Sequence, residues 1–358
     1  MGSIPPAGTT LSTAISLPRF YRLTGLLLQV DYARLRAVSM TKCSQCSESS
    51  PANRFTRAAV FANIRSDRGK SRRLAAKIRD EFLARGIAVE VMETASAEEL
   101  DFHARQQIQA GTPLLFAVGG DGTCQGLVNA AYGHDVVLGI IPTGGGNDFA
   151  QALGLPKDPI AALRSALAGE SRAIDLVKVC TGAGHVRLYL GGGGIGLDAA
   201  AAQHAASSFK NWPGRWRYIA SAIRAYIGCA PGRIRITQLP SEEESVWELA
   251  ILASVVNTPT LGAGIRIAPA AKIDDGELNL VLLGDLQLGR LLRLLPQLAL
   301  RGTLNLPSLR TTNVRKLRIE ADPPSMFHGD GELLGLTPVE IEVVPRAVEF
   351  LAPKRLER

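Results

Sequence analysis

Apolar and polar residues follow two different patterns along the chain. Between residues 56 and 173, apolar runs long enough for buried strands alternate with amphipathic stretches of helical period. The pattern predicts strands at Arg57–Asn63 and Ala88–Met92, and helices at Ser71–Arg85 and Ala97–Ala110. This alternation favours a doubly wound parallel sheet with helices on both faces, an arrangement that binds ligands at the carboxyl ends of its strands.

Near Asp175 the pattern changes to short apolar runs punctuated by Gly and Pro, which is typical of a β-rich, sandwich-like domain. Helices are predicted only at Trp216–Ile227 and Leu286–Arg301. The predicted strands are Ile174–Val179, Arg187–Leu190, Arg233–Gln238, Glu248–Val256, Glu277–Leu283, Val314–Glu320 and Val339–Val344.

Two glycine-rich segments, Pro113–Gly133 and Leu138–Pro156, each read as a buried strand, a glycine turn and a helix. Such a turn presents free backbone N–H groups and the positive end of a helix dipole, which together suit a phosphate. Asp121 stands inside the first turn. A carboxylate beside phosphate needs a reason, such as holding a metal, fixing the loop by hydrogen bonds, or taking part in proton chemistry.

The paired motifs Gly119-Gly-Asp-Gly-Thr123 and Gly144-Gly-Gly-Asn-Asp148 resemble the catalytic domain shared by diacylglycerol kinases, sphingosine and ceramide kinases and bacterial soluble lipid kinases. Three later segments occur in that family's order, namely Gly194–Ala199, Asp274–Leu278 and Asp330–Glu332. The stretch Gly262–Pro269 is also similar to the family's glycine-rich and iAPxA elements. The resemblance covers the chain from about Ala58 onward.

The resemblance implies an N-terminal nucleotide-binding α/β domain and a C-terminal β-rich domain, with the nucleotide cleft between them. We expect a disordered extension at 1–55, the α/β domain at 56–173 plus about 345–358, and the lipid-substrate domain at 174–344. The activity implied is an ATP-dependent, Mg²⁺-dependent lipid kinase. It would transfer the γ-phosphate to a hydroxyl of a lipid such as diacylglycerol or a sphingoid base.

Residues of both glycine motifs and of the first two strand ends are implied to contact the nucleotide. They are Asn63, Thr94, Gly119, Gly120, Asp121, Gly122, Thr123, Cys124, Gln125, Thr143, Gly144, Gly145, Asn147 and Asp148. Two departures from the family pattern stand out. The proline that follows Asn63 in the family is replaced by Ile64, and the family threonine is replaced by Gly145, where the Thr143 hydroxyl is a partial substitute.

Acidic residues in the second half provide the remaining candidate chemistry. By resemblance, the Asp275 carboxylate and the carbonyls of Lys272 and Glu277 hold a structural Mg²⁺, although an Asp-Gly turn forms without a metal. Phosphoryl transfer to an alcohol needs a proton acceptor. Glu332 is the first choice for this base and Asp330 the second. Together with Asp121 they form the expected catalytic set, and His328 is a rival base on its intrinsic pKa.

The chain has a net charge of +7, so we expect an anionic partner. We favour a nucleotide and an anionic membrane surface over nucleic acid, and the pattern makes no prediction of the oligomeric state. No apolar run is long enough to span a bilayer, which predicts a cytoplasmic protein in peripheral contact with the membrane. Candidate contacts are the Trp/Arg cluster Lys210–Tyr218, with Trp212 and Trp216, and the leucine-rich helix Leu286–Arg301. The five cysteines argue against a disulfide framework, and Cys43-Ser-Gln-Cys46 lacks a second metal-binding pair.

Two alternative functions stay open. NAD kinases also carry Gly-Gly-Asp-Gly-Thr before a helix, but the segments Pro142–Asp148 and Asp274–Gly276 favour the lipid-kinase family. A degenerate, non-catalytic lipid-binding regulator would explain the two departures, whereas the retained carboxylates of Asp121, Asp275, Asp330 and Glu332 argue against it.

Overall fold

The computed structural model describes residues 54–63, 68–208, 212, 214–227, 231–241, 247–262, 264–284, 289 and 308–355. The chain divides into two units, Met1–Gln45 and Cys46–Arg358, and every described residue belongs to the second. Three expectations lie outside the described residues: nearly all of the N-terminal extension, the Cys43/Cys46 pair, and the helix at 286–301 apart from Gly289.

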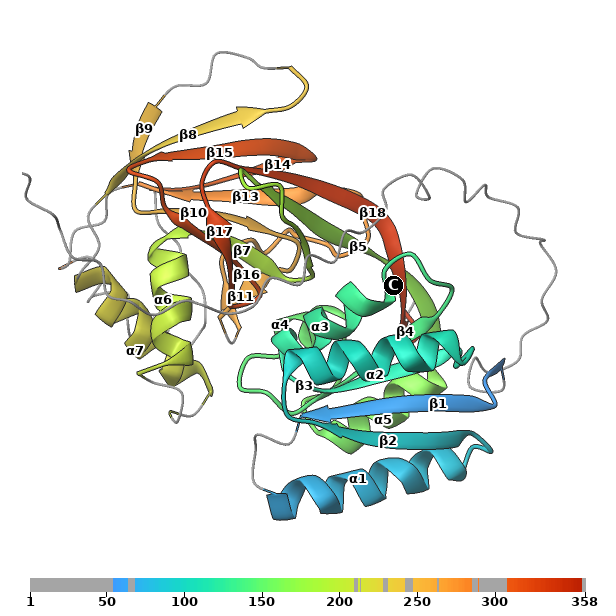
Figure 1. The fold of residues 1–358 in the computed structure, drawn as a ribbon. Coiled ribbons are helices and arrows are strands. Elements are labelled where there is room, and N and C mark those ends of the chain that lie inside the picture. Colours follow the sequence, from blue (N-terminus) through green and yellow to red (C-terminus); the bar gives the residue numbers. More distant parts are fainter. Residues whose placement is uncertain are drawn as a thin grey trace, which may run out of the picture. The chain divides into compact units, whose positions relative to one another are not determined.

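Strands and helices alternate in the first half of the described chain, as the hydrophobic pattern predicts (Figure 1). The strands pair in parallel in the order β2-β1-β3-β4. The elements are β1 (Arg57–Asn63), α1 (Arg68–Leu83), β2 (Ala88–Thr94), α2 (Ala97–Gln109), β3 (Leu114–Gly119), α3 (Asp121–Ala131), β4 (Val137–Pro142), α4 (Asp148–Ala152) and α5 (Pro159–Ala168). The predicted α/β architecture is therefore confirmed.

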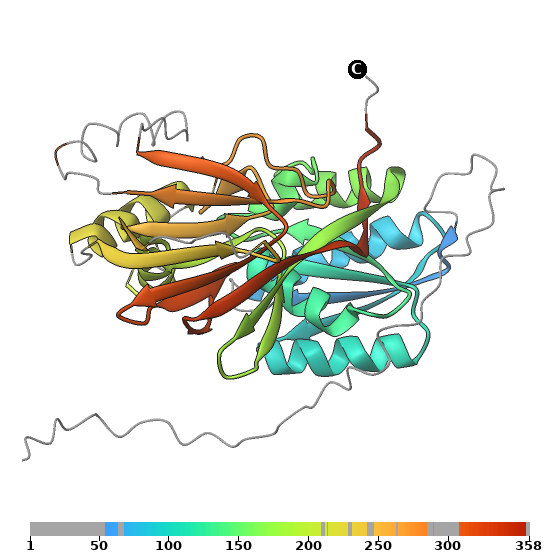
Figure 2. The ribbon, with the colours of Figure 1, turned by 90° about the horizontal axis from the view of Figure 1, so that it is seen from above.

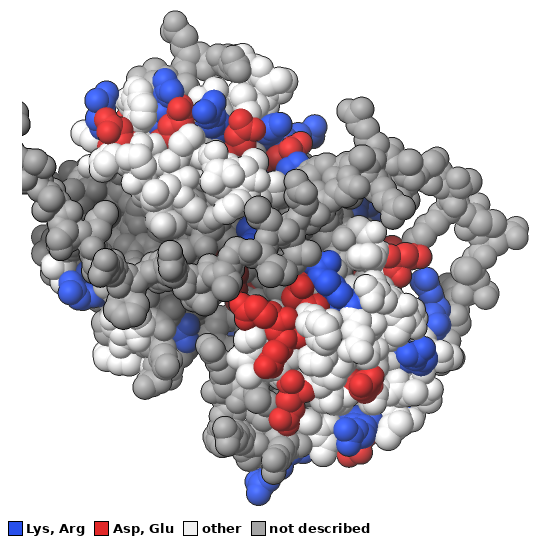
Figure 3. Space-filling model, viewed as in Figure 1, with Lys and Arg blue, Asp and Glu red and all other residues white. Residues whose placement is uncertain are grey.

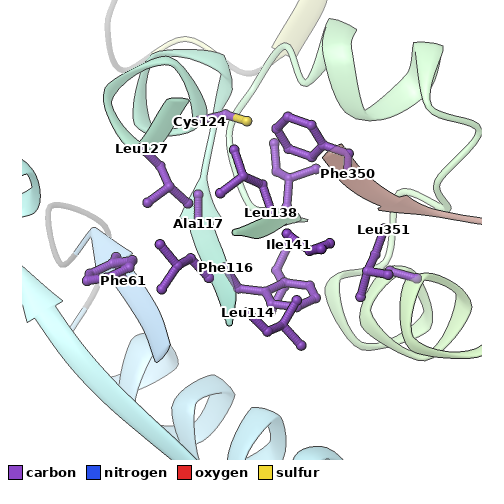
Figure 4. Packing of buried hydrophobic residues seen from close by; sticks show 14 of the residues in the cluster. Phe61, Leu114, Phe116, Ala117, Cys124, Leu127, Leu138, Ile141, Phe350 and Leu351 are labelled. Atoms are coloured by element: carbon purple, nitrogen blue, oxygen red, sulfur yellow. The ribbon is translucent and has the colours of Figure 1, made fainter. Parts of the chain in front are cut away.

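Local sequence signals explain where these elements begin. Strands β3 and β4 are buried along their whole length, which accounts for their unbroken apolar runs. The Ser96 hydroxyl caps α2 by accepting from the Glu99 N–H, and Asp158 caps α5 by accepting from the Ala161 N–H. Side chains of β3, β4 and α3 fill the core together with Phe350 and Leu351 from the far end of the chain (Figure 4).

The second half is mainly β-structure, with two helices beside one of its sheets. Its elements are β5 (Glu170–Thr181), β6 (Val186–Tyr189), β7 (Gly192–Gly196), α6 (Leu197–Ala206), α7 (Gly214–Ile227), β8 (Gly232–Gln238), β9 (Trp247–Ala250), β10 (Leu252–Val256), β11 (Thr260–Leu261), β12 (Ile265–Arg266), β13 (Leu278–Leu283), β14 (Leu309–Val314), β15 (Lys316–Asp322), β16 (Met326–Gly329), β17 (Glu332–Leu336) and β18 (Val339–Ala352). None of the helices described is long and apolar enough to cross a bilayer.

One ten-stranded sheet runs through both halves. Its main path is β2-β1-β3-β4-β18-β15-β8-β9, and β5 pairs with β18 and β6 at the branch. The last residues of β18 run parallel to β4, with Glu349 opposite Val137, while its first residues pair antiparallel with β15. A six-stranded sheet, β14-β13-β10-β7-β16-β17, lies beside the β-rich part of the first sheet (Figure 2). Apolar side chains of both sheets pack together in one core cluster.

Two predicted strands are each divided in the structure. Glu248–Val256 contains β9 of the large sheet and β10 of the small one, because the chain changes sheets at Ile251. Val314–Glu320 contains the end of β14 and most of β15, which also lie in different sheets. In both places no Gly or Pro marks the change of sheet, so the sequence pattern shows no boundary.

Gly139 in β4 packs directly against a buried aromatic ring in the α/β core. A Cβ at this position would lie 2.2 Å from the Phe116 ring, which is itself fully buried. We expect Gly139→Ala to lower the free energy of unfolding by about 1–3 kcal/mol, because the ring has no space into which to move. Chemical denaturation measures this. Gly232→Ala is the control, since its Cβ would have no neighbour within 4 Å, and an equal effect of the two changes would contradict the packing argument.

Candidate active site

The two glycine loops lie against each other at the carboxyl ends of β3 and β4. The Thr143 N–H donates to the Gly119 carbonyl at 2.9 Å. A Cβ on Gly144 would lie 2.6 Å from the Gly120 Cα, and a Cβ on Gly119 would lie 2.3 Å from the Thr123 Oγ1. These contacts require glycine at both positions.

The helix α3 has no side-chain cap, and the N–H groups of Thr123 and Cys124 both donate to the Gly120 carbonyl. The N–H groups of Asp121 and Gly122 are therefore the ones at the helix start that suit an anion.

Asp121 fixes the second loop to the first. Its carboxylate accepts from the backbone N–H groups of Asp148 at 3.2 Å and Phe149 at 3.1 Å, so it links the start of α3 to the start of α4. Burial, together with the nearby carboxylates of Asp148 and Asp330, raises the pKa of Asp121 to about 7, although its two backbone hydrogen bonds oppose the shift. Of the three roles considered for this carboxylate, fixing the loop by hydrogen bonds is visible in the structure.

The side chains of Asn147 and Asp148 form hydrogen bonds with different parts of the chain. Asn147 has a positive φ of 56°, and its amide both accepts from the Gly144 N–H and donates to the Gly144 carbonyl, which closes the loop. Asp148 is buried and accepts from the Thr260 hydroxyl at 2.6 Å and the Gly264 N–H at 2.8 Å. This carboxylate therefore joins the α/β half to the β11–β12 hairpin of the β-rich half.

The other residues implied to contact nucleotide divide into two groups. Asn63 and Thr94 stand opposite each other in register at the ends of β1 and β2, which places them at the same sheet edge as the loops. Cys124 and Gln125 instead face inward. Cys124 lies in the apolar core (Figure 4), and the Gln125 amide donates to the Leu188 carbonyl of β6. Their side chains are thus turned away from this edge.

The Asp330-Gly331-Glu332 turn joins β16 to β17. Asp330 has a positive φ of 48°, and its carboxylate accepts from three backbone N–H groups at 2.8–3.1 Å, those of Leu190, Gly191 and Gly192. Burial raises the pKa of Asp330, and the three donors only partly oppose this effect. With its oxygens so occupied, Asp330 is suited to hold the turn in place.

Glu332 lies over the start of α3. Its Oε1 is 4.0 Å from the position that a Cβ on Gly122 would take. Desolvation and the Asp330 charge raise the pKa of Glu332, while Arg187 on β6 opposes them. Glu332 thus lies next to the first glycine loop. Unlike the carboxylates of Asp121 and Asp330, its carboxylate accepts no hydrogen bond from a backbone N–H group of the described residues.

His328 belongs to a buried polar cluster behind this turn. Its Nε2 is 3.0 Å from the Asp198 carboxylate, which also accepts from the Ser254 hydroxyl at 2.5 Å. Burial works to lower the pKa of His328, but Asp198 outweighs it and the pKa lies above its ordinary value. The ring is only 2% exposed, so this position does not favour His328 as a base for an incoming hydroxyl.

The Asp274–Glu277 turn has the shape expected of an Asp-Gly turn. The exposed Asp275 carboxylate accepts from the Glu277 N–H at 3.0 Å, while Asp274 pairs with Arg355. The Gly276 N–H donates to Asp175, which is fully buried and also accepts from the Arg346 N–H. Asp175 thus connects this turn to β5 and β18. Sequence reasoning missed its role, although a lone acidic residue within an apolar strand is a usable signal.

Acidic side chains gather near the centre of the face shown in Figure 3, between the elements of the two halves.

Two tryptophans of the Lys210–Tyr218 cluster lie at the surface. Trp212 is 50% exposed and Trp216 is 58% exposed. Lys210 and the side chains of Arg215 and Tyr218 lie outside the described residues.

Comparison with known sequences decides the family. The profile of the diacylglycerol kinase catalytic domain matches residues 57–179, and that of the YegS C-terminal NAD kinase beta sandwich-like domain matches residues 193–352. The chain is 30% identical over 272 residues to a diacylglycerol kinase of Mycobacterium tuberculosis (strain ATCC 25618 / H37Rv), covering 75% of this chain and 86% of the relative. The chain belongs to the diacylglycerol kinase and YegS-like lipid kinase family.

Two further similarities agree with this family. A protein of Stenotrophomonas maltophilia (strain K279a) named "Probable lipid kinase YegS-like" is 30% identical over 281 residues, covering 75% of this chain and 88% of that protein. The crystal structure of a diacylglycerol kinase from Bacillus anthracis str. Sterne superposes with a TM-score of 0.63 at 18% identity, covering 83% of this chain and 97% of that one. The structural match shows the shared fold.

The His328–Asp198 pair should be visible in the pH dependence of stability. The pKa of His328 is raised in the folded protein. Its contribution to the free energy of unfolding is therefore full below the ordinary pKa of 6.5 and is lost as the pH rises through the pKa of the folded state. Burial works to raise the pKa of Asp198, but His328 and Ser254 hold it below its ordinary value, so its contribution is lost only in acid. We expect His328→Gln to lower the free energy of unfolding by about 3–5 kcal/mol near pH 6, and by less at higher pH.

Denaturant titrations between mildly acidic and alkaline pH measure this difference. The control is His134→Gln, at an exposed histidine before β4. A His328→Gln effect that stayed constant with pH would mean that the ring contributes packing and no charge.

Proposed function

We propose that this protein is an ATP-dependent lipid kinase that transfers the γ-phosphate to a hydroxyl of a lipid such as diacylglycerol or a sphingoid base. The observation that carries the proposal is the position of Glu332 over the first turn of α3, next to the anion-binding glycine loops. A carboxylate there is placed to accept a proton from an alcohol that attacks a phosphate bound at the helix start. Membership in the lipid kinase family supports the same reaction.

In this proposal the nucleotide lies along the carboxyl ends of β1, β2 and β3. Asn63 and Thr94 would contact its base and ribose end, and the loop from Gly119 to Thr123 would contact its phosphates. Cys124 and Gln125 would not contact the nucleotide through their side chains, because these face inward. Gly144, Gly145, Asn147 and Asp148 would form the far wall, with Thr143 as the nearest hydroxyl on that side.

The three proposed catalytic carboxylates have separate tasks. Glu332 accepts the proton of the lipid hydroxyl. Asp330 positions Glu332, because three backbone donors hold its carboxylate in place. Asp121 holds the two glycine loops together and lies beside the phosphates.

A divalent cation fits the acidic centre of the site. The neighbouring carboxylates of Asp121, Asp330 and Glu332 would repel a triphosphate, and Mg²⁺ bound to the nucleotide would neutralise that charge. A second Mg²⁺ is proposed at Asp275 with the carbonyls of Lys272 and Glu277. No three His, Cys, Asp or Glu side chains of the described residues come together as a metal site, and the proposed set needs only one side chain.

A membrane surface is the proposed source of the lipid. The net charge of +7 and the two exposed tryptophans of the Lys210–Tyr218 cluster support reversible contact with anionic lipids from the cytoplasmic side. NAD kinase is the second candidate, because the C-terminal profile is described as NAD kinase beta sandwich-like.

A phosphorylation assay tests the proposal. Purified full-length protein is incubated with labelled ATP, Mg²⁺ and either a lipid extract or NAD, and label is expected in the lipid. Glu332→Gln should lower turnover by about 10²–10⁴-fold, whereas Glu340→Gln, at an exposed carboxylate on β18, should retain it. Label only in NAD, label in neither acceptor, or turnover by Glu332→Gln near that of the wild type would each overturn part of the proposal.

The pH profile gives a second test of Glu332. A base acts in its ionised form, so kcat/KM should fall as the pH drops through the pKa of Glu332. Because this pKa is raised, the fall should begin above the ordinary value of 4.5. The residual activity of Glu332→Gln should lack this acidic limb.

The proposed Mg²⁺ at Asp275 predicts metal-dependent stability. Asp275→Ala should remove most of the increase in Tm that Mg²⁺ gives the wild type, since an ion that binds only the folded state stabilises it. Asp135→Ala, at an exposed residue before β4, is the control. Equal Mg²⁺ responses of wild type and Asp275→Ala would leave the segment as a simple turn.

A further inference from the structure

The β11–β12 hairpin of the β-rich half is fixed directly to the second glycine loop. The Thr260 hydroxyl on β11 and the Gly264 N–H in the hairpin turn both donate to the Asp148 carboxylate, at 2.6 and 2.8 Å. Figure 1 shows the hairpin beside α4, the helix that Asp148 begins. Because the Asp148 N–H in turn donates to Asp121, one chain of hydrogen bonds connects the hairpin with the proposed phosphate loop.

The start of the hairpin also reaches the Asp330 turn. Thr258, two residues before β11, donates its N–H to the Gly191 carbonyl, and the Gly191 N–H donates to the Asp330 carboxylate at 2.9 Å. A Cβ on Gly191 would lie 3.0 Å from Asp330 Oδ1 and 3.4 Å from Thr258 Oγ1, so these two side chains lie close to one point. The hairpin therefore connects the surroundings of Asp330 with those of Asp148, and both carboxylates act on the charge of Asp121.

Arg266 on β12 stands directly opposite Thr260 in this hairpin. Side chains of directly opposite residues lie on the same face of an antiparallel pair. The neighbouring pair, Leu261 with Ile265, lies on the other face and packs against the apolar core. Since the Thr260 hydroxyl reaches Asp148, the face that carries Arg266 is the one turned toward the start of α4.

Arg266 brings a positive charge to an acidic part of the site. Its side chain is exposed and forms no ion pair with the described residues. A second arginine, Arg187 on β6, donates to the Val186 carbonyl, and its charge acts on Glu332. A transferring phosphoryl group carries negative charge on its oxygens, and the planar arginine fork matches their geometry and stabilises that charge. Arg266 is therefore suited to an anion held between the glycine loops and the Asp330 turn.

We propose that Arg266 binds the γ-phosphoryl group of the nucleotide and stabilises its charge during transfer. This inference rests on the proposed lipid kinase function and adds the side chain that contacts the transferred group. In that reaction the lipid hydroxyl oxygen bonds to the γ-phosphorus and the hydroxyl proton passes to Glu332. The bond from this phosphorus to the β–γ bridging oxygen breaks, and ADP leaves with the electron pair. Arg266 forms no covalent bond in any of these steps.

Arg266→Gln tests the role in transfer. In full-length protein with the lipid extract and labelled ATP with Mg²⁺, turnover should fall by about 10²–10³-fold, the usual effect of removing one donor to a developing charge. Arg266→Lys keeps the charge but loses the planar fork, so its turnover should lie between those of Arg266→Gln and the wild type. The Tm of both variants should stay near that of the wild type, because the side chain is exposed.

Calorimetry gives a readout that does not depend on turnover. The wild type and Arg266→Gln are titrated, without lipid, with ADP and with the non-hydrolysable ATP analogue AMP-PNP, both with Mg²⁺. Only the analogue has a γ-phosphoryl group. Its Kd should rise by about ten-fold in Arg266→Gln, as expected for one lost hydrogen-bonded charge pair, while the Kd of ADP should change by less than about two-fold.

The matched control is Arg318→Gln, at an exposed arginine on β15 of the same half. It should retain turnover and both nucleotide affinities. Equal changes in the Kd of ADP and of the analogue, unchanged turnover of Arg266→Gln, or a marked fall in its Tm would each overturn the inference. Loss of binding to anionic vesicles with unchanged nucleotide affinities would assign Arg266 to the membrane instead.

The outcomes for the wild type separate this inference from the proposed function. If the wild type labels lipid and Arg266→Gln does so equally well, the function survives and the role of Arg266 is wrong. If the wild type labels no lipid, the function is wrong, and the calorimetric comparison still decides whether Arg266 contacts the γ-phosphoryl group. Absence of nucleotide binding by the wild type would overturn both.

Discussion

Carboxylates that accept hydrogen bonds from backbone N–H groups hold the loops of this molecule in position. Asp121 ties the start of α3 to the start of α4, Asp330 holds the strand entry at Leu190–Gly192, and Asp175 joins the Asp275 turn to the bend of β18. When the carboxylate is ionised, each of these bonds pairs a charged acceptor with a neutral donor and is stronger than an ordinary amide hydrogen bond. Because donor and acceptor lie far apart in sequence, the same bonds bring the separate motifs together.

This arrangement has an electrostatic cost that also shapes the site. Burial raises the pKa of Asp121, Asp175 and Asp330, and neighbouring carboxylates add to the effect at Asp121. A site that concentrates negative charge next to an anion-binding helix start is suited to a substrate that arrives with its own cation. The nucleotide loops and the acidic residues are therefore compatible when a divalent ion accompanies the phosphates. Behind the turn, burial of His328 is outweighed by the carboxylates of Asp198 and Asp330, which raise its pKa and favour its positively charged form there.

The sequence was sufficient for the α/β half and for the family. The bounds of β1 are those predicted, because its apolar run begins and ends with exposed residues. Where the chain changes sheets, at Ile251 and near Arg315, no Gly or Pro marks the change and the boundary was not visible. Strand β7 was missed because Gly192, Gly193 and Gly194 have no β-propensity, whereas close contacts with β10 and β16 leave no space for side chains there. Partners such as Ser254 and Thr260 carry no local signal, since their importance depends on carboxylates elsewhere in the chain.

The two departures from the family pattern have limited structural consequence because the site is built mainly from backbone. Gly145 replaces a threonine, yet the contact between the loops depends on Gly120 and Gly144, and the loop is closed by Asn147. Loss of the proline after Asn63 leaves β1 paired with β2 up to Asn63 and Thr94. A non-catalytic protein would have no need of costly features in this site, yet this chain has the positive φ of Asp330 and the buried carboxylate of Asp198. Strain and buried charge of this kind persist where a site still needs its geometry, which favours an active enzyme over a non-catalytic lipid-binding regulator.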